Sequence, residues 1–435
     1  MRRILTGLSA VLLASFLSSC QLFEPPPPNA CWAPPGSSYG LSTSSTVLTS
    51  QKLRPLGDFS LPHVPGEILV KGEAPTELLS ALGASEKQKK LPPGWRLIEV
   101  PAGSEYEAAV RLLSAGASAA EPNYYLRPLR VPNDTYYDSY QKSYMEGLLH
   151  LEEAWDVQTG APSLTIAVVD TGYLPHPDLA SRIVTPLPNV KLDTADEDQD
   201  PTDDTAAGAF GHGLAVAGII GAVTNNDEGI AGVTWSGQLL PIKVFPSGGD
   251  TASEADIVEA LIVAREQGAK IVNLSLGFSG MSNLIEDELQ GGYQAGTVYV
   301  AASGNANAND VYYPAKSVYT LAVGAVDGSK NRADFSNYGS ELDLVAPGVS
   351  VAILAKSGSN YAYAQGDGTS FATPIVTGVA ALYVQAYLSK YGQHPTSARV
   401  FACLRSTAED LGASGKDPYY GNGLVRPDRI LLTKP

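Results

Sequence analysis

Short alternating segments of apolar and polar residues characterise the chain between residues 66 and 129. Residues 67–70 and 96–100 have the composition of strands, and residues 120–126 that of a final strand. Residues 76–82 and 105–115 have the apolar spacing of helices. This order of elements predicts a split βαβ, ferredoxin-like unit, although the pattern fits an independent small module of another kind equally well.

Continuous apolar runs replace this alternation further along the chain. Residues 164–169 (Leu-Thr-Ile-Ala-Val-Val) are typical of a strand that is buried on both faces of a parallel sheet. Small and aliphatic residues over 214–220 and 375–388 indicate buried helices. The later part of the chain is therefore expected to form an α/β domain with a mostly parallel sheet.

The first twenty residues have the composition of an export signal. Arg2 and Arg3 precede an apolar run over 4–17, which is too short to cross a bilayer as a helix. The run ends in Leu-Ser-Ser-Cys at Cys20, which resembles the cleavage site of bacterial lipoproteins and implies a lipid on that cysteine. A plain signal peptide with a cysteine beside its cleavage site is the alternative. Both interpretations predict a secreted or cell-envelope protein.

A linker rich in Pro, Ser and Thr is predicted over residues 20–62, because this composition cannot bury enough apolar surface to offset its ordering entropy. Cys31 lies in this linker, and Cys403 lies in a predicted helix far along the chain. The sequence does not tell how close the two cysteines are. We therefore interpret Cys403 as a small buried hydrophobic residue.

Composition and charge exclude several classes of protein. Hydrophobic residues make up 44% of the chain and charged residues 17%, as in an ordinary folded protein. The net charge is −16, and residues 131–435 carry all of the acidic excess, with 17 basic and 35 acidic side chains. A surface of this charge repels phosphate backbones and anionic lipid headgroups, so no nucleic-acid partner is expected.

Three polar residues stand at the ends of predicted elements. Asp170 ends the 164–169 strand in an Asp-Thr-Gly sequence, His212 opens a helix in Gly-His-Gly, and Ser370 opens another in Gly-Thr-Ser. Open α/β sheets place their sites at the carboxyl ends of strands, and a helix N-terminus favours nearby negative charge. Taken singly, the histidine could be structural and the serine a helix cap. An aspartic protease is excluded, since no second Asp-Thr-Gly or Asp-Ser-Gly occurs.

The chain order Asp170, His212, Ser370 is that of the subtilisin-like serine proteases, and residues 132–431 resemble this family. The supporting blocks are Asn-Leu-Ser-Leu-Gly (273–277), Ala-Ala-Ser-Gly-Asn (301–305), Val-Gly-Ala-Val-Asp (323–327), Phe-Ser-Asn-Tyr-Gly (335–339) and Val-Ala-Pro-Gly (345–348). The resemblance implies a doubly wound, mostly parallel sheet and a serine endopeptidase. It makes Ser370 the nucleophile, His212 the base and Asp170 its orienting partner, and assigns the amide of Asn305 to the oxyanion site.

Two departures from the family pattern concern the surroundings of these residues. Leu214 and Ala215 replace the Thr-His pair that usually follows the His-Gly sequence, and the segment from Asp170 to residues 176–179 is one residue shorter than usual. Neither replaced residue transfers a proton. We therefore expect activity to survive, and the shorter segment to affect the fine geometry of its loop.

The resemblance also implies a substrate-binding site. An extended peptide would pair with one wall and contact a second, formed by Ser275, Leu276 and Gly277 and by Ala302, Ser303 and Gly304. Alignment places Tyr312 at the floor of the pocket for the residue before the scissile bond, which predicts a preference for small residues there. The alternative is that Tyr312 points to solvent.

A structural Ca²⁺ site is implied at residues 223–230. Its ligands would be the carbonyls of Val223, Glu228 and Ile230, the amide oxygen of Asn226, and the carboxylates of Asp134 and Asp178. A second acidic run comprises Asp193, Asp196, Glu197, Asp198, Asp200, Asp203 and Asp204. This run is interpreted either as a second calcium loop or as a solvated, self-repelling loop.

The resemblance divides the chain into a signal (1–19), the linker (20–62), an inhibitory propeptide (63–130) and a catalytic domain (131–435). Autocleavage between about Arg127 and Pro132 would separate the protease from the N-terminus tethered through Cys20. The mature enzyme could then diffuse away unless it stays in complex with its propeptide. Expected partners are protein or peptide substrates and the propeptide, with a monomeric enzyme. The alternatives are a non-catalytic, lipid-anchored envelope scaffold and an enzyme that cuts only itself.

Overall fold

The computed structural model describes residues 31–32, 56–59, 63–125, 130–184, 190–205, 211–358 and 360–432. The predicted signal segment, Cys20 and Arg127 lie outside these residues. The described elements belong to two units, each with its own sheet and its own hydrophobic core.

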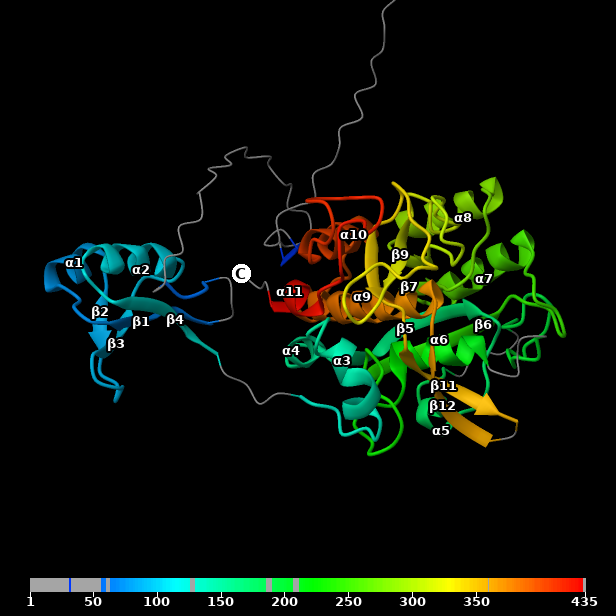
Figure 1. The fold of residues 1–435 in the computed structure, drawn as a ribbon, viewed down its shortest axis with the longest axis horizontal. Coiled ribbons are helices and arrows are strands. Elements are labelled where there is room, and N and C mark those ends of the chain that lie inside the picture. The colour runs from blue at the N-terminus through cyan, green and yellow to red at the C-terminus, as the bar shows by residue number, and fades with distance from the viewer. Residues whose placement is uncertain are drawn as a thin grey trace, which may run out of the picture.

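The first unit is a four-stranded antiparallel sheet with two helices (Figure 1). Its elements are β1 (His63–Lys71), α1 (Thr76–Ala81), β2 (Ser85–Lys87), β3 (Trp95–Glu99), α2 (Glu105–Ser114) and β4 (Ala119–Tyr124). The strand order β2-β3-β1-β4 is that of the ferredoxin-like fold, which confirms the predicted class. Sequence analysis missed β2 because its three residues, Ser-Glu-Lys, are all exposed and form a polar edge strand.

The second unit contains the remaining elements. Its helices are a π-helical segment (Tyr137–Gln141), α3 (Lys142–Met145), α4 (Leu151–Trp155), α5 (Pro177–Ala180), α6 (His212–Gly221), α7 (Glu254–Glu266), α8 (Asn283–Gln294), α9 (Thr369–Tyr391), α10 (Ser397–Thr407) and α11 (Pro427–Leu432). Its strands are β5 (Gly160–Asp170), β6 (Ser236–Lys243), β7 (Ile271–Leu274), β8 (Val298–Ala302), β9 (Thr320–Val326), β10 (Leu344–Pro347), β11 (Val351–Ser357) and β12 (Asn360–Gly366).

Six of these strands form one parallel sheet in the order β10-β9-β8-β7-β5-β6. Helices α6 and α9 pack on one face of this sheet, and α7 and α8 pack on the other (Figure 1). The strands read as nearly continuous apolar runs because both faces are covered. The prediction of a doubly wound, mostly parallel α/β domain is confirmed.

Helix α9 runs through the centre of this domain. It is the one helix of the described residues that is long and apolar enough to span a bilayer by length and composition, and 94% of its apolar window is buried inside the protein. Its predicted core, residues 375–388, extends in both directions, so that Ser370 lies in its first turn. The antiparallel hairpin of β11 and β12 directly precedes this turn. Sequence analysis did not predict the hairpin, whose second strand is largely polar and exposed.

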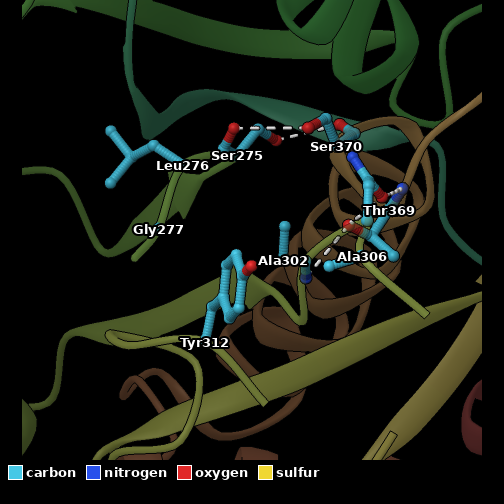
Figure 2. Close-up of a pocket in the computed structure, with 10 residues that line it drawn as sticks. Ser275, Leu276, Gly277, Ala302, Ala306, Tyr312, Thr369 and Ser370 are labelled. Carbon is cyan, nitrogen blue, oxygen red and sulfur yellow. Dashed lines mark hydrogen bonds between the residues drawn. The ribbon is translucent and has the colours of Figure 1, made fainter. Parts of the chain in front are cut away.

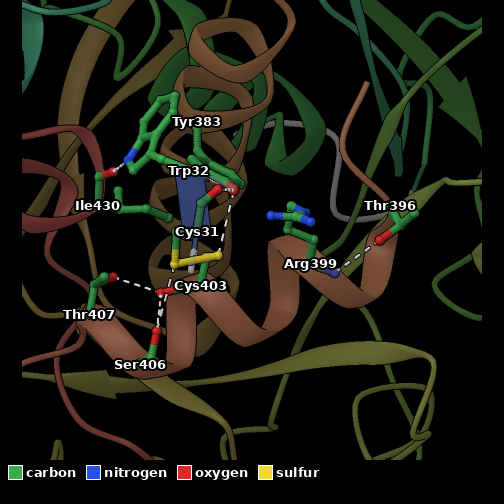
Figure 3. Close-up of a disulfide and its surroundings, with 9 residues drawn as sticks. All are labelled: Cys31, Trp32, Tyr383, Thr396, Arg399, Cys403, Ser406, Thr407 and Ile430. Carbon is green, nitrogen blue, oxygen red and sulfur yellow. Dashed lines mark hydrogen bonds between the residues drawn. A yellow bond between two sulfur atoms is a disulfide. The ribbon is translucent and has the colours of Figure 1, made fainter. Parts of the chain in front are cut away.

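Cys31 and Cys403 form a disulfide, with their Cα atoms 5.4 Å apart (Figure 3). The interpretation of Cys403 as an unpaired hydrophobic residue is therefore wrong. Cys403 is indeed fully buried, but in contact with a segment that precedes it by 372 residues. Proximity between positions so far apart depends on tertiary packing, which local patterns do not report.

Candidate active site

The predicted site residues lie at the carboxyl edge of the parallel sheet. Asp170 ends β5, Ser275 directly follows β7, and Ala302 ends β8. Neighbouring parallel strands end at the same edge, so these segments meet in space. The first turn of α9 contributes Ser370 to the same place, because Ser275 and Ser370 are hydrogen-bonded (Figure 2).

Asp170 and His212 form a close pair. The Nδ1 atom of His212 lies 2.6 Å from Oδ1 of Asp170, whose side chain is 1% exposed. A carboxylate can only accept a hydrogen bond, so Nδ1 carries the proton and Nε2 of the neutral imidazole is the acceptor. Burial is the largest single effect and lowers the pKa of His212, but the charge and hydrogen bond of Asp170, together with the charge of Asp203, raise it above its ordinary 6.5.

Two residues that sequence analysis did not assign to the site support this pair. The hydroxyl of Thr171 donates to Oδ2 of Asp203 at 2.7 Å and accepts from the backbone N–H of Gly213 at 3.0 Å. The charge of Asp203 also raises the pKa of His212. Sequence analysis grouped Asp203 with the second acidic run, interpreted as a calcium loop or a solvated loop, whereas the structure buries it beside Thr171. Its position next to the Asp-Thr-Gly turn depends on the fold and has no local signal.

Ser370 and His212 share no hydrogen bond among the residues that the structure describes. The hydroxyl of Ser370 donates to the carbonyl of Ser275 at 3.3 Å, and the Ser275 hydroxyl donates to the carbonyl of Ser370 at 2.9 Å (Figure 2). The ring of Phe371, the next residue, lies 5.8 Å from the His212 ring between centroids. The hydroxyl of Ser370 is therefore directed to the Ser275 carbonyl and not to the imidazole. Catalytic hydrogen bonds in ligand-free enzymes often form only when substrate binds.

Asn305 is held with its amide nitrogen available. Its Oδ1 accepts hydrogen bonds from the backbone N–H of Thr369 at 2.9 Å and from the Thr369 hydroxyl at 2.8 Å. A backbone N–H can only donate, so this contact fixes which amide atom is oxygen. No protein group within the described residues accepts from Nδ2. Asn305 is exposed and lines the cavity in front of Ser370, so an oxyanion there would meet a ready donor.

A cavity of about 350 Å³ lies between the two predicted walls. It is lined by Ser275, Leu276, Gly277, Ala302, Gly304, Asn305, Ala306, Tyr312, Thr369 and Ser370 (Figure 2). Ser303 is the one residue of the predicted walls that does not line it. Its side chain is fully buried, and its hydroxyl donates to the carbonyl of Asn337 at 3.3 Å. Ser303 therefore supports the wall from behind.

Tyr312 faces this cavity. Its ring lies between the two walls in Figure 2. A Cβ atom at Gly304 would come within 2.8 Å of Cδ2 of the ring, and one at Gly277 within 3.3 Å of the Tyr312 Cβ. Gly304 also has a φ of +104°, which favours glycine. Gly304 thus makes room for the ring. The alternative that Tyr312 points away to solvent does not describe its position.

The predicted calcium ligands converge around two buried carboxylates. Asp178 accepts from the N–H of Ile230 at 3.1 Å and from Nδ2 of Asn226 at 2.9 Å. Asp134 accepts from the N–H of Asn225 at 2.8 Å, while its Oδ1 is buried without a partner. Burial raises the pKa of both carboxyls, that of Asp178 to about 7.

This cluster fits a cation. Its carboxylates have no cationic partner among the described residues, and the orphaned Oδ1 of Asp134 costs free energy unless a ligand satisfies it. The amide oxygen of Asn226 accepts from the N–H of Glu228 at 3.0 Å, and Val223 donates its N–H to the carbonyl of Asp178 at 2.7 Å. Asn226 thus presents its Nδ2, and not the predicted ligand oxygen, to Asp178. The two buried carboxylates still supply the oxygen ligands that suit Ca²⁺.

The second acidic run is organised around a lysine. The ammonium of Lys243, at the end of β6, is fully buried and lies 2.7 Å from Asp193, 2.8 Å from Asp196 and 3.3 Å from Asp204. Its hydrogen bonds lower the pKa of Asp196. The run is therefore neither simply solvated nor self-repelling, and a divalent cation among these carboxylates would face the Lys243 charge.

The chain is similar to known serine proteases over most of its length. A family model described as the subtilase family matches residues 162–423. The thermophilic serine proteinase of Bacillus sp. (strain AK1) is 34% identical over 380 residues, 84% of this chain and 89% of the relative. Thermitase of Thermoactinomyces vulgaris is 35% identical over 295 residues, 68% of this chain and 96% of the relative.

Solved structures agree with these relatives. A structure titled proteases from Pseudoalteromonas arctica PAMC 21717 has a TM-score of 0.62 and 31% identity, and the match covers 69% of this chain and 99% of that one. The family model spans more than half of the chain and includes Asp170, His212 and Ser370. The chain belongs to the subtilase family of serine peptidases.

Proposed function

We propose that the protein is a secreted serine endopeptidase that acts through Asp170, His212 and Ser370. The observation that carries this proposal is the 2.6 Å pair of His212 and Asp170 at the edge of the sheet where Ser370 and Asn305 line one cavity. A non-catalytic scaffold with this fold has no use for an imidazole paired with a buried carboxylate at the sheet edge where a hydroxyl and an available amide donor line a cavity.

The chemistry begins with the hydroxyl of Ser370. When substrate fills the cavity, this hydroxyl turns from Ser275 to Nε2 of His212, which takes its proton as Oγ attacks the peptide carbonyl. The Asp170 carboxylate stabilises the imidazolium that forms. Nδ2 of Asn305 and the backbone N–H of Ser370 bind the oxyanion. The imidazolium then protonates the leaving amine. Water next attacks the acyl-enzyme while His212 takes its proton, and His212 returns that proton to Oγ of Ser370 as the acid product leaves.

A labelling experiment separates the enzyme from a scaffold. A fluorophosphonate should modify the wild-type chain and leave Ser370→Ala unmodified, with circular dichroism showing that the variant is folded. Equal labelling of both proteins would reject the proposed nucleophile. Casein digestion by the mature form then distinguishes a general endopeptidase from an enzyme that cuts only itself, which would leave casein intact while its own chain is processed.

Substrate specificity follows from the cavity. An extended peptide pairing with residues 275–277 is bound through its backbone, so most of its side chains are not selected. The ring of Tyr312 occupies part of the space for the residue before the scissile bond. We therefore expect small residues, such as Ala, to be preferred at that position.

Replacing Tyr312 with Gly should enlarge this pocket and move the preference toward Phe and Leu. Burial of the added apolar surface favours the larger residues, because one buried methylene contributes about 0.8 kcal/mol. Ratios of kcat/KM for matched Ala and Phe peptides measure the change. Tyr361→Gly, an exposed position outside the cavity, is the control. A wild-type preference for Phe or Leu over Ala would contradict the assignment.

We further propose that Ca²⁺ binds the 223–230 loop and is structural. Asp134, Asp178, Asn226 and the carbonyls of Val223, Glu228 and Ile230 would hold it, and the ion would neutralise the buried carboxylates. Because a ligand that binds only the folded state stabilises it, removal of the ion should lower the melting temperature.

The pH dependence of the chelated protein tests this site. In the folded, ion-free protein the pKa of Asp178 is raised from 3.8 to about 7, so folding resists loss of that proton. The contribution to the stability of the folded state is present below pH 4 and is lost as the pH rises to 7. We expect the melting temperature in chelator to fall between pH 5 and pH 8, and calcium to reverse most of that fall. An Asp178→Asn variant that behaves like wild type in both series would contradict the assignment.

The remaining proposals concern maturation and location. We propose that residues 63–130 act as an inhibitory propeptide, that the chain is cut between Arg127 and Pro132, and that the signal segment directs export. The ferredoxin-like sheet supports the first of these. N-terminal sequencing of the mature enzyme and the mass of any acyl group on Cys20 measure the other two.

A further inference from the structure

Cys31 and Trp32 precede the ferredoxin-like unit in the chain but belong to the core of the catalytic domain. Cys31 is fully buried, and Trp32 is 1% exposed. Both are part of the main hydrophobic cluster, and neither is part of the cluster of the first unit. The catalytic domain therefore contains a docking site for Cys31 and Trp32, which precede the predicted cleavage segment in the chain.

The docking site is formed by α9 and α11. The indole of Trp32 packs edge-on against Tyr383, with ring centroids 5.6 Å apart, and stacks on Tyr387 at 6.4 Å. Its Nε1 donates to the carbonyl of Ile430 at 3.1 Å (Figure 3). The backbone of the segment is also held, because the Tyr383 hydroxyl donates to the carbonyl of Cys31 at 2.7 Å and the Tyr391 hydroxyl donates to that of Trp32.

The disulfide attaches the segment covalently to a further helix, α10. Cys403 lies in α10, and its partner Cys31 lies before the whole of the first unit. The two cysteines close a loop of chain that includes residues 63–125 and the proposed cleavage segment. A cut in that segment opens the loop without releasing either piece.

We propose that the Cys31–Cys403 disulfide and the docked Trp32 keep the N-terminal segment on the catalytic domain after the cut, so that the mature protease is a two-chain molecule. This inference rests on the proposed function only for the cut itself. A lipid on Cys20 would then retain the mature enzyme, in contrast to the expectation that the enzyme diffuses away after the cut. An anchor on the N-terminal segment holds the mature enzyme as well as the precursor.

Gel electrophoresis with and without dithiothreitol tests the proposal on the purified, processed enzyme. Dithiothreitol is oxidised as the two cysteines regain their thiols. We expect a fluorophosphonate-labelled species that loses mass only on reduction, with mass spectrometry identifying a released peptide that contains Cys31. A labelled catalytic chain that is already free of this peptide without reduction would overturn the proposal, and so would an active enzyme whose chain is never cut.

A second experiment distinguishes failure of the proposed function from failure of the proposed disulfide attachment. In Ser370→Ala, trypsin can supply the cut after Arg130, which is exposed and lies outside the helices and strands. We expect the peptide that contains Cys31 to stay with the catalytic domain until reduction. Its release without reduction would overturn the proposed attachment, whereas retention combined with absent self-processing in wild type would reject autocleavage and leave the disulfide link intact.

Matched variants separate the covalent from the packed attachment. In Cys31→Ser, only the non-covalent contacts of Trp32 and of the segment's backbone remain, so we expect retention in buffer and release under denaturing conditions. In Trp32→Ala the disulfide persists, and we expect retention under both conditions until reduction. Equal release of the segment from wild type and Cys31→Ser under denaturing, non-reducing conditions would contradict the assigned pairing.

Discussion

Replacing Asp170 with Asn should lower kcat about 10⁴-fold, the size of loss known for the equivalent change in other serine proteases. The 2.6 Å contact between Asp170 and Nδ1 of His212 keeps the proton on Nδ1 and leaves Nε2 free to accept from Ser370. An amide at position 170 can donate to Nδ1 instead, which favours the wrong tautomer. Initial rates on a peptide substrate measure the loss, and KM should change little.

The pH profile of the same variant separates a tautomer effect from misfolding. In the wild type, activity requires neutral His212, so kcat/KM should fall as the pH drops through a pKa above 6.5. The Asp170→Asn change removes the charge that raises this pKa, and the acid limb should move to lower pH. An Asp170→Asn enzyme with wild-type activity, or with an unmoved acid limb, would contradict the assigned pairing.

Replacing Asn305 with Ala should lower kcat by about 10²- to 10³-fold, a magnitude taken from loss of such a donor in a subtilisin. The side chain is held through its Oδ1 by Thr369, so Nδ2 is positioned before substrate arrives. If the hydrogen bond from Nδ2 is stronger in the transition state than in the ground state, its loss lowers kcat and has little effect on KM.

Steady-state kinetics of Asn305→Ala and of a matched variant test this role. Asn309→Ala is the control, because Asn309 is also an exposed asparagine of the same loop and does not line the cavity. We expect normal kinetics from the control and normal thermal stability from both. A rise in KM with unchanged kcat would show that Asn305 only positions the substrate.

The parallel sheet and the ends of its strands could be predicted from local patterns. The run over 164–169 is apolar because both faces of β5 are covered, and a polar residue at its end therefore lies at the sheet edge. Small-residue helices such as α6 and α9 are recognisable for the same reason. Both patterns reflect the burial of the element itself, so they can be recognised from the residues of that element alone.

Features that depend on contacts between distant segments were missed. Lys243 ends strand β6, and its burial is understandable only once Asp193 and Asp196 are seen beside it. Asp203 reaches the site through Thr171, and Cys31 pairs with a cysteine in a helix near the other end of the chain. In each case the individual residue type fits several environments, and the partner that decides between them lies far away in the sequence.

A crystal structure of the enzyme with a phosphonate bound at Ser370 tests the central claim most directly. The account predicts phosphorus on Oγ, with this oxygen turned from the Ser275 carbonyl to within hydrogen-bond distance of Nε2 of His212. A phosphoryl oxygen should accept hydrogen bonds from Nδ2 of Asn305 and the N–H of Ser370. An adduct whose Oγ remains beside Ser275 and out of reach of the imidazole would contradict it.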